Sequence, residues 1–272
     1  MTDLTLEQTP AGWNPGAQQY AQKFAPFTGA FAADAVELLG IGATDEVLDV
    51  AAGSGAFAIR AAERGADVLA VDFASGMLDA LRTAVPSGVA GSVRTAVMDG
   101  QKLDLERRRF SASASIFGAI FFPDVGAGLR ELARVTRADG RMAVTSWSDD
   151  SARLSRLVGE AIRRAVPGIS LPAGRAKAAL GTPVGCAATL IEHGWRDVEV
   201  HVVTHDLIVG EEPAAFFHSM SEWSAPVRPL TDRLDAAQMD RAAAAFAEVV
   251  AGSAPEGDRV PFSGLLSIGV PA

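Results

Sequence analysis

The chain has 272 residues, 49% of them apolar and 21% charged, and its 24 basic and 33 acidic side chains give a net charge of −9. So much apolar material and so little excess charge exclude a mainly disordered chain, and the length suits one core with at most a small appendage. The acidic balance argues against nucleic-acid binding, which relies on clustered Lys and Arg.

A single cysteine, Cys186, excludes an internal disulfide and a cysteine-rich metal site. The four histidines lack a metal-ligand spacing, so we expect no metal. The polar, acidic start is unlike a secretory signal, and no apolar run reaches the roughly eighteen residues of a membrane helix. These features predict a cytoplasmic protein that acts on a small molecule, without a membrane or nucleic-acid partner.

In chain order, a helical pattern over 16–40 comes first, and Pro26 is expected to divide it. Short apolar runs then alternate with further helical patterns, which predicts right-handed βαβ units. The expected strands are 46–51, 67–72, 92–98, 110–117, 141–147, 198–209 and 262–270. The expected helices between them are 54–64, 75–84, 124–136, 154–165, 183–193, 213–224 and 234–251. The fold class is therefore α/β, a Rossmann-like doubly wound fold with a mostly parallel seven-stranded sheet.

We expect one domain over 1–272, in which the helices outside the alternation serve as a lid and a cap. Its parts are N-terminal lid helices at 1–43, a cofactor-binding half at 44–147, cap insertions at 148–182 and 211–255, and the last helix and strands at 183–210 and 256–272. A parallel α/β sheet binds ligands at the carboxyl ends of its strands, so the lid and the cap are expected over that edge.

The most informative segment is VLDVAAGSGAF, residues 47–57, which joins a strand to a helix through a glycine turn. Glycines there let the backbone approach a ligand and place it at a helix N-terminus. The second strand ends in Asp72, where an acid can accept both hydroxyls of a ribose. A third acid, Asp99, ends the third strand and can accept from an adenine amine.

Two ligand classes fit this turn. The turn, written as Gly53-x-Gly55-x-x-Ala58, matches a dinucleotide-binding fingerprint with Ala in the third position. An NAD(P)-dependent oxidoreductase is therefore one alternative. Asp49, inside the first strand, argues against that alternative because a carboxylate beside a pyrophosphate would be repulsive. It suits a positively charged neighbour, such as an ammonium or a sulfonium.

The full pattern, Asp49-x-Ala51-x-Gly53-x-Gly55 followed by Asp72 and Asp99-Gly100, resembles class I S-adenosylmethionine-dependent methyltransferases. Within them it looks like the branch of quinone-biosynthesis and natural-product enzymes. The segments 117–124, 130–141, 181–183 and 193–198 also resemble that family, so the likeness covers about residues 44–210.

The resemblance implies an enzyme that transfers a methyl group from S-adenosylmethionine to nitrogen, carbon or oxygen of a small, largely apolar or aromatic metabolite, leaving S-adenosylhomocysteine. Specialised metabolism is the expected setting. A protein of this fold that keeps the cofactor without transferring a methyl group is a further alternative.

The resemblance also implies individual roles. Asp72 would bind the ribose, Asp49 would lie near the ammonium, and Asp99 would flank the adenine. The complete set of expected cofactor residues is Asp49, Ala51, Gly53, Gly55, Asp72, Met77, Asp99, Gly100 and Phe117. Ala51 departs from the family, which often has Gly there.

Candidate residues for binding the methyl acceptor are predicted from their residue type. Five aromatic residues are candidates for it: Tyr20, Phe24, Phe121, Trp147 and Trp223. His218, in the second cap insertion, is the candidate general base, because an imidazole titrates near neutral pH. Its alternative role is that of a surface or helix-packing residue.

Overall fold

The computed structural model describes residues 4–151, 154–171, 179–210, 212–253 and 258–272. Short parts of both expected cap insertions, at 152–153, 172–178, 211 and 254–257, lie outside the described residues.

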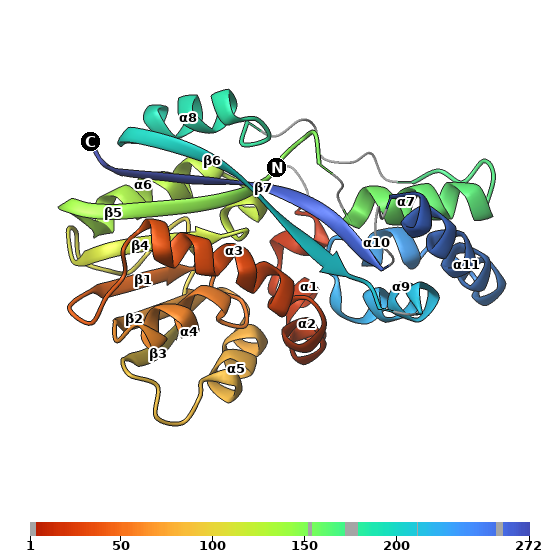
Figure 1. Ribbon diagram of the computed structural model, residues 1–272, viewed down its shortest axis with the longest axis horizontal. Helices are drawn as coiled ribbons and strands as arrows, with labels where there is room; N and C mark the ends of the chain where they lie inside the picture. Colours follow the sequence, from red (N-terminus) through yellow and green to blue (C-terminus); the bar gives the residue numbers. More distant parts are fainter. Residues whose placement is uncertain (1–3, 152–153, 172–178, 211, 254–257) are drawn as a thin grey trace.

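The described residues form a seven-stranded sheet in the order β3-β2-β1-β4-β5-β7-β6 (Figure 1). The first five strands pair in parallel, whereas β7 is antiparallel to both β5 and β6. The strands are β1 (Glu46–Val50), β2 (Asp67–Asp72), β3 (Ser92–Val97), β4 (Phe110–Ile116), β5 (Thr136–Trp147), β6 (Trp195–Ile208) and β7 (Arg259–Pro271). The predicted fold class is confirmed.

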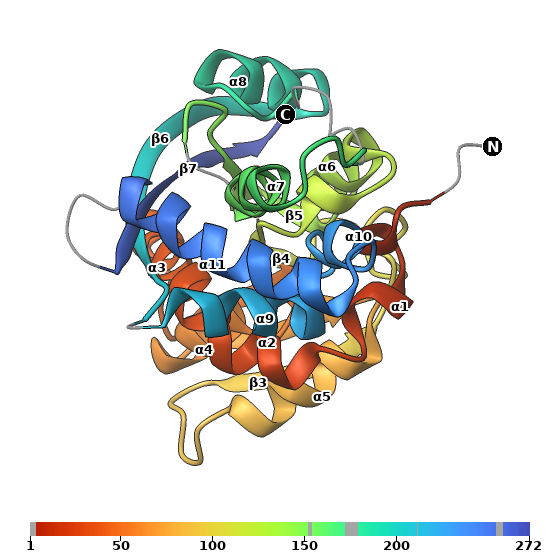
Figure 2. The ribbon, with the colours of Figure 1, turned by 90° about the vertical axis from the view of Figure 1, so that its right-hand side faces the viewer.

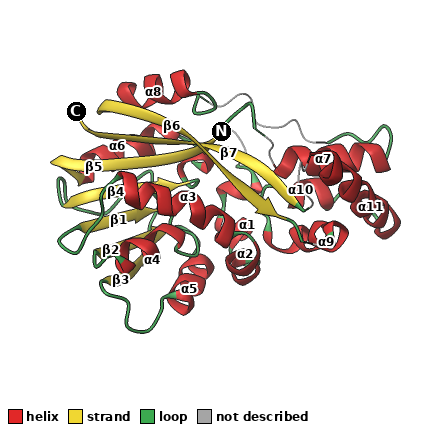
Figure 3. Cartoon of the chain, in the orientation of Figure 1, coloured by secondary structure: helices red, strands yellow, loops and turns green. Residues whose placement is uncertain are grey.

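Helices cover both faces of the sheet (Figures 1 and 3). They are η1 (Leu6–Gln8), α1 (Pro10–Trp13), α2 (Ala17–Lys23), α3 (Ala25–Leu38), α4 (Ala56–Glu63), α5 (Ser75–Ala84), η2 (Ala119–Phe121), α6 (Val125–Val135), α7 (Leu154–Ala165), α8 (Pro183–Glu192), α9 (Pro213–Trp223), α10 (Arg228–Thr231) and α11 (Ala236–Ser253).

Strand alternation explains the two-sided core. Successive side chains of a strand point to opposite faces, and in β1 Val47 packs with the side of α3 and α4, whereas Leu48 and Val50 pack with the side of α6 and α8. All three are buried completely. A parallel sheet covered in this way exposes its backbone and ligand-facing groups only at the strand ends.

A third apolar cluster joins α7, α9 and α11 beyond the carboxyl ends of the strands. Figure 2 views the molecule from this side, and these helices lie in front of the sheet. We call α7, α9, α10 and α11 the cap. Its position agrees with the expectation that helices outside the alternation gather over this edge.

The expected break near Pro26 is present, but several other boundaries differ from the predictions: β6 and β7 each begin three residues early, and η1, α1 and η2 were not predicted. α2 ends at Lys23 and α3 begins at Ala25, so the break falls just before Pro26, which occupies the first turn of α3. β5 begins at Thr136, five residues early, because Thr136 pairs with Phe110. The short helix α10 was not predicted. No helix in the described residues is long and apolar enough to cross a membrane.

Candidate functional site

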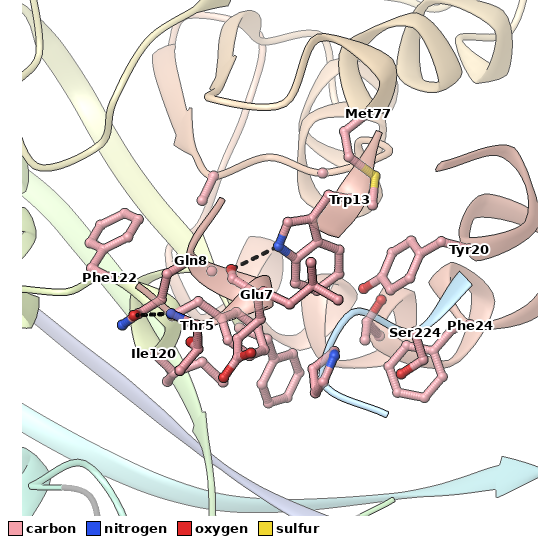
Figure 4. Close-up of a pocket in the computed structure, with 18 of the residues that line it drawn as sticks. Thr5, Glu7, Gln8, Trp13, Tyr20, Phe24, Met77, Ile120, Phe122 and Ser224 are labelled. Carbon is pink, nitrogen blue, oxygen red and sulfur yellow. Dashed lines mark hydrogen bonds between the residues drawn. The ribbon is translucent and has the colours of Figure 1, made fainter. Parts of the chain in front are cut away.

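A cavity of about 990 Å³ lies between the carboxyl ends of the strands and the cap. Its lining comes from the strand ends, the N-terminal segment, α7 and the link between α9 and α10 (Figure 4). We call the lining at the ends of β1, β2 and β3 the floor; it contains Asp49, Gly53, Ser54, Asp72 and Asp99.

Asp49 is 1% exposed, and its Oδ2 accepts a hydrogen bond from Ala58 N at 3.1 Å. Ala58 lies in the first turn of α4, so the carboxylate stabilises the start of that helix. Burial, followed by the nearby charge of Asp72, raises the pKa of Asp49 to about 7, although the Ala58 bond opposes this. A cation placed beside it would lower that pKa again.

Asp72 is the second buried carboxylate of the floor. Its Oδ2 accepts from Gly53 N and its Oδ1 from Ala74 N, both at 2.8 Å. These bonds tie the end of β2 to the glycine turn, and the backbone N–H of Phe73 also interacts with this carboxylate, which borders the cavity. Burial raises the pKa of Asp72 to about 6 despite these bonds.

The glycine turn has two glycines with different functions. Both adopt the left-handed backbone, with φ of +55° at Gly53 and +89° at Gly55. A Cβ on Gly53 would meet nothing within 4 Å, because it would enter the cavity, whereas a Cβ on Gly55 would lie 2.5 Å from Leu81 Cγ. Gly53 therefore keeps space for a ligand, and Gly55 allows α4 and α5 to pack.

Ala51, which departs from the family pattern, also has a positive φ of 55°. A Cβ on Gly118 would lie 2.5 Å from Ala51 Cβ, so the glycine after β4 makes room for the alanine. Ser54 follows in the turn, and its buried Oγ has no hydrogen-bond partner among the described residues. Because it borders the cavity, this hydroxyl can meet a polar ligand.

The part of the floor at the end of β3, which was predicted to flank an adenine, is less enclosed. Asp99 is exposed, and its Oδ1 accepts from the backbone and side-chain nitrogens of Gln101, at 2.9 and 3.0 Å. Gly100 is buried against Val50 and Phe122, which a Cβ would overlap. Met77 is 2% exposed and borders the cavity (Figure 4).

Phe117 and Trp147 form an aromatic wall at the ends of β4 and β5. Their rings stack with centroids 3.8 Å apart and an interplanar angle of 14°. Phe117 has a φ of 57°, a strained conformation for a non-glycine residue, and its N–H donates to Thr145 Oγ1 at 2.8 Å. Both residues line the cavity.

The remaining aromatic candidates also line the cavity. Tyr20 and Phe24 come from α2 and its end, and Phe24 stacks on Trp223 of α9 with centroids 5.4 Å apart. Phe121 packs edge-on against Trp13, 5.3 Å away. Burial raises the pKa of Tyr20 to about 12, so its phenol stays protonated at neutral pH and can donate a hydrogen bond (Figure 4).

His218 is placed outside this group. Its side chain is 44% exposed and lies 3.5 Å from Asp240 Oδ1, and it does not line the cavity. On α9 the buried residues Phe217, Met220 and Trp223 mark the inner face, and His218 projects from the other side of the helix. The structure thus gives His218 its alternative role as a surface residue, and we do not retain it as a candidate base.

Several lining residues were missed by sequence reasoning. The N-terminal segment Leu4 to Gln8 borders the cavity, held in place where Trp13 Nε1 donates to Glu7 O at 2.9 Å. Arg156 and Arg163 of α7 border it as well. No local motif marks these residues, although the spacing of the two arginines on one face of a predicted helix was visible in the sequence.

Comparisons with known proteins agree with this site. Residues 47–140 match the family model described as a methyltransferase domain. A demethylmenaquinone methyltransferase of Mycobacterium sp. (strain JLS) is 38% identical over 130 residues, which are 47% of this chain and 54% of that protein. The chain thus spans about half the length of the curated relatives it matches.

Solved structures share the fold at low sequence identity. Phosphoethanolamine N-methyltransferase 2 of Haemonchus contortus, in complex with phosphomonomethylethanolamine and S-adenosylhomocysteine, has a TM-score of 0.55 at 16% identity over 89% of this chain and 52% of that one. The [4+2]-cyclase SpnF has a TM-score of 0.53 at 16% identity over 90% of this chain and 82% of that one.

Residues 47–140 are therefore similar to a methyltransferase domain, and the strand order and the strand-end acids agree with that class. The curated relatives include demethylmenaquinone methyltransferases, so the predicted resemblance to the quinone-biosynthesis branch is confirmed.

Proposed function

We propose that this protein is an S-adenosylmethionine-dependent methyltransferase that acts on a small, largely apolar or aromatic metabolite. The observation that carries the proposal is the pair of buried carboxylates, Asp49 and Asp72, at one end of a cavity that also has aromatic walls. A ligand with a positive charge and hydroxyl groups suits the carboxylates, and an apolar acceptor suits the aromatic walls.

The residues present fit this cofactor. A polar cradle is formed by the space beside Gly53, by the Ser54 hydroxyl, which has no partner among the described residues, and by the Asp72 carboxylate at the cavity. Asp72 would bind the ribose hydroxyls, Asp49 would lie near the ammonium, and Asp99 with Gly100 would flank the adenine. The cofactor would also be bordered by Ala51, Met77 and Phe117, whereas Gly55 would act indirectly by allowing α4 to pack on α5.

When bound, the cofactor would supply a methyl group on a positively charged sulfur. The protein's task is then to hold an acceptor in line with it and to exclude water. The Phe117–Trp147 stack, together with Phe24 and Trp223, provides apolar walls for this purpose. None of the described lining residues is a histidine, and the Tyr20 phenol keeps its proton. Such a lining suits a nucleophile that needs no strong base, such as an amine or an electron-rich carbon.

The N-terminal helices and the cap border the same cavity as the strand ends, which supports our proposal that residues 1–272 form a single domain. We also propose that the protein is cytoplasmic and binds neither nucleic acid nor membrane; its net charge of −9 supports the absence of a nucleic-acid partner.

Calorimetry with S-adenosylhomocysteine and with NADH, followed by transfer of a labelled methyl group to a panel of aromatic amines, phenols and quinols, tests the proposal. We expect S-adenosylhomocysteine to bind, NADH not to bind, and at least one acceptor to gain label. Tight NADH binding would favour the oxidoreductase, and cofactor binding without transfer to any acceptor would favour a protein of this fold that is not a methyltransferase.

A further inference from the structure

The cap side of the cavity carries two arginines on one face of α7. Arg156 and Arg163 are two helical turns apart, and both line the cavity together with Gly159, which lies between them, and Ser155, which precedes Arg156. α7 lies beyond the ends of β4 and β5 in both views of the molecule (Figures 1 and 2).

Gly159 explains how Arg163 reaches the cavity. Side chains on a helix lean toward its N-terminus, so Arg163 leans back over the turn that contains Gly159. A Cβ on the buried Gly159 would lie 3.4 Å from Arg163 Nη2 and 3.7 Å from Leu171 Cδ1. The guanidinium therefore packs across the space that the glycine leaves, on the same side of the helix as Arg156.

Arg156 and Arg163 differ from Arg164, on the same helix, in their lack of an ion-pair partner among the described residues. Arg164 forms an ion pair with Glu160, four residues earlier. Neither Arg156 nor Arg163 has an ion pair or a side-chain hydrogen bond with any described residue. Two guanidinium groups that pair with none of the described residues therefore border one cavity, in a chain whose net charge is −9.

The charges of the lining are divided between its two sides. Among the described lining residues, the carboxylates belong to Glu7 of the N-terminal segment and to Asp49, Asp72 and Asp99 at the strand ends, whereas the arginines belong to α7. A ligand with one negative end would be repelled by the floor and attracted to α7, which fixes the direction in which it enters.

We propose, on the basis of the methyltransferase function above, that the acceptor carries an oxyanion, a carboxylate or a phosphate, which Arg156 and Arg163 bind. A guanidinium group offers paired N–H donors that match both oxyanions. The apolar remainder of the acceptor then extends along the aromatic walls toward the floor. Arg156 and Arg163 determine specificity and take no part in the chemistry.

Three probes with one ring system test this: 1-naphthoate, 1-naphthyl phosphate and neutral 1-naphthamide, each titrated into the protein saturated with S-adenosylhomocysteine. We expect at least one anion to bind about ten-fold or more tightly than the amide, since charge-assisted hydrogen bonds distinguish them. The stronger of the two anions identifies the group.

The variant Arg156→Ala/Arg163→Ala is expected to lose this preference, whereas the matched control Arg164→Ala keeps it. Affinity for S-adenosylhomocysteine, measured separately, should be the same in all three proteins. Equal binding of the amide and both anions, no binding of any probe, or a preference that survives in the double variant would each overturn the inference. Failure to bind S-adenosylhomocysteine would instead count against the proposed function.

Discussion

The floor and the cap line the same cavity, but different interactions hold them. The floor is fixed by hydrogen bonds between carboxylates and backbone N–H groups, as between Asp72 and Gly53. The cap is fixed by apolar packing, with Phe217, Met220 and Phe246 buried completely. Substitutions in the floor should therefore affect mainly ligand binding, whereas substitutions of buried cap residues should affect mainly the free energy of unfolding.

The largest effect is expected from Trp223→Ala in the cap. Trp223 is 2% exposed, stacks on Phe24 and donates from Nε1 to Ser219 Oγ at 3.2 Å. Its removal should lower the free energy of unfolding by about 3–5 kcal/mol, as for other buried tryptophans. Chemical denaturation measures this.

His218→Ala is the control from the same helix. Its ring is 44% exposed and pairs only at 3.5 Å with Asp240, so the change in stability should stay within about 0.5 kcal/mol. If Trp223→Ala and His218→Ala lost similar amounts of stability, the distinction between a buried and an exposed face of α9 would be wrong.

The next effect concerns the floor. Gly53→Val should weaken binding of S-adenosylhomocysteine by about 100-fold or more, because the new side chain would fill the cavity. The variant also takes on strain of about 1–2 kcal/mol at a positive φ.

Gly88→Val separates these two contributions. Gly88 has a φ of +83° and open space beside it, but it does not line the cavity. We expect a similar loss of stability in both variants and a loss of binding, by calorimetry, in Gly53→Val alone. Normal binding by Gly53→Val would show that the turn does not contact a ligand.

Asp72→Ala should have an intermediate effect. Loss of two charge-assisted hydrogen bonds to a ribose would weaken binding of S-adenosylhomocysteine by about 1.5–3 kcal/mol. Asp99→Ala, which removes an exposed carboxylate bonded only to Gln101, should weaken it less. The ribose assignment fails if calorimetry gives Asp72→Ala the affinity of the parent.

The smallest expected effect is a change of cofactor affinity with pH, caused by the two buried carboxylates of the floor. Because burial raises the pKa of Asp49 to about 7 and of Asp72 to about 6, both are partly protonated at pH 6. If the cofactor binds the ionised forms, its affinity should rise by about ten-fold between pH 6 and pH 7.

Stability of the ligand-free protein should change in the opposite direction. Both pKa values are raised above the unfolded value of 3.8, so the contribution of these groups is present below about pH 4 and is lost as pH rises through 6 and 7. Calorimetry and thermal melts over this range measure the two trends, and Asp49→Asn should flatten both. An affinity that is constant from pH 5.5 to 7.5 would contradict the assignment.

The sequence by itself determined the fold class and most of the floor. The alternation of strands and helices leads to a parallel sheet, and the strand ends must share one edge, so Asp49, Asp72 and Asp99 were expected to meet there. Each is fixed by its position in a local strand–turn–helix unit, which depends on residues close in the sequence. Phe117 was expected from the family resemblance, and Trp147 from its residue type.

Only the tertiary structure decided the cap side. The sequence showed an amphipathic α9, yet whether His218 entered the cavity depended on how that helix packed against α11 and α2. It likewise could not show that Glu7 and Arg163 would border the same cavity, since they are far apart in the chain. Helix packing brings such residues together through side-chain shape, for example where Gly159 leaves room for a guanidinium, and no local pattern records that fit.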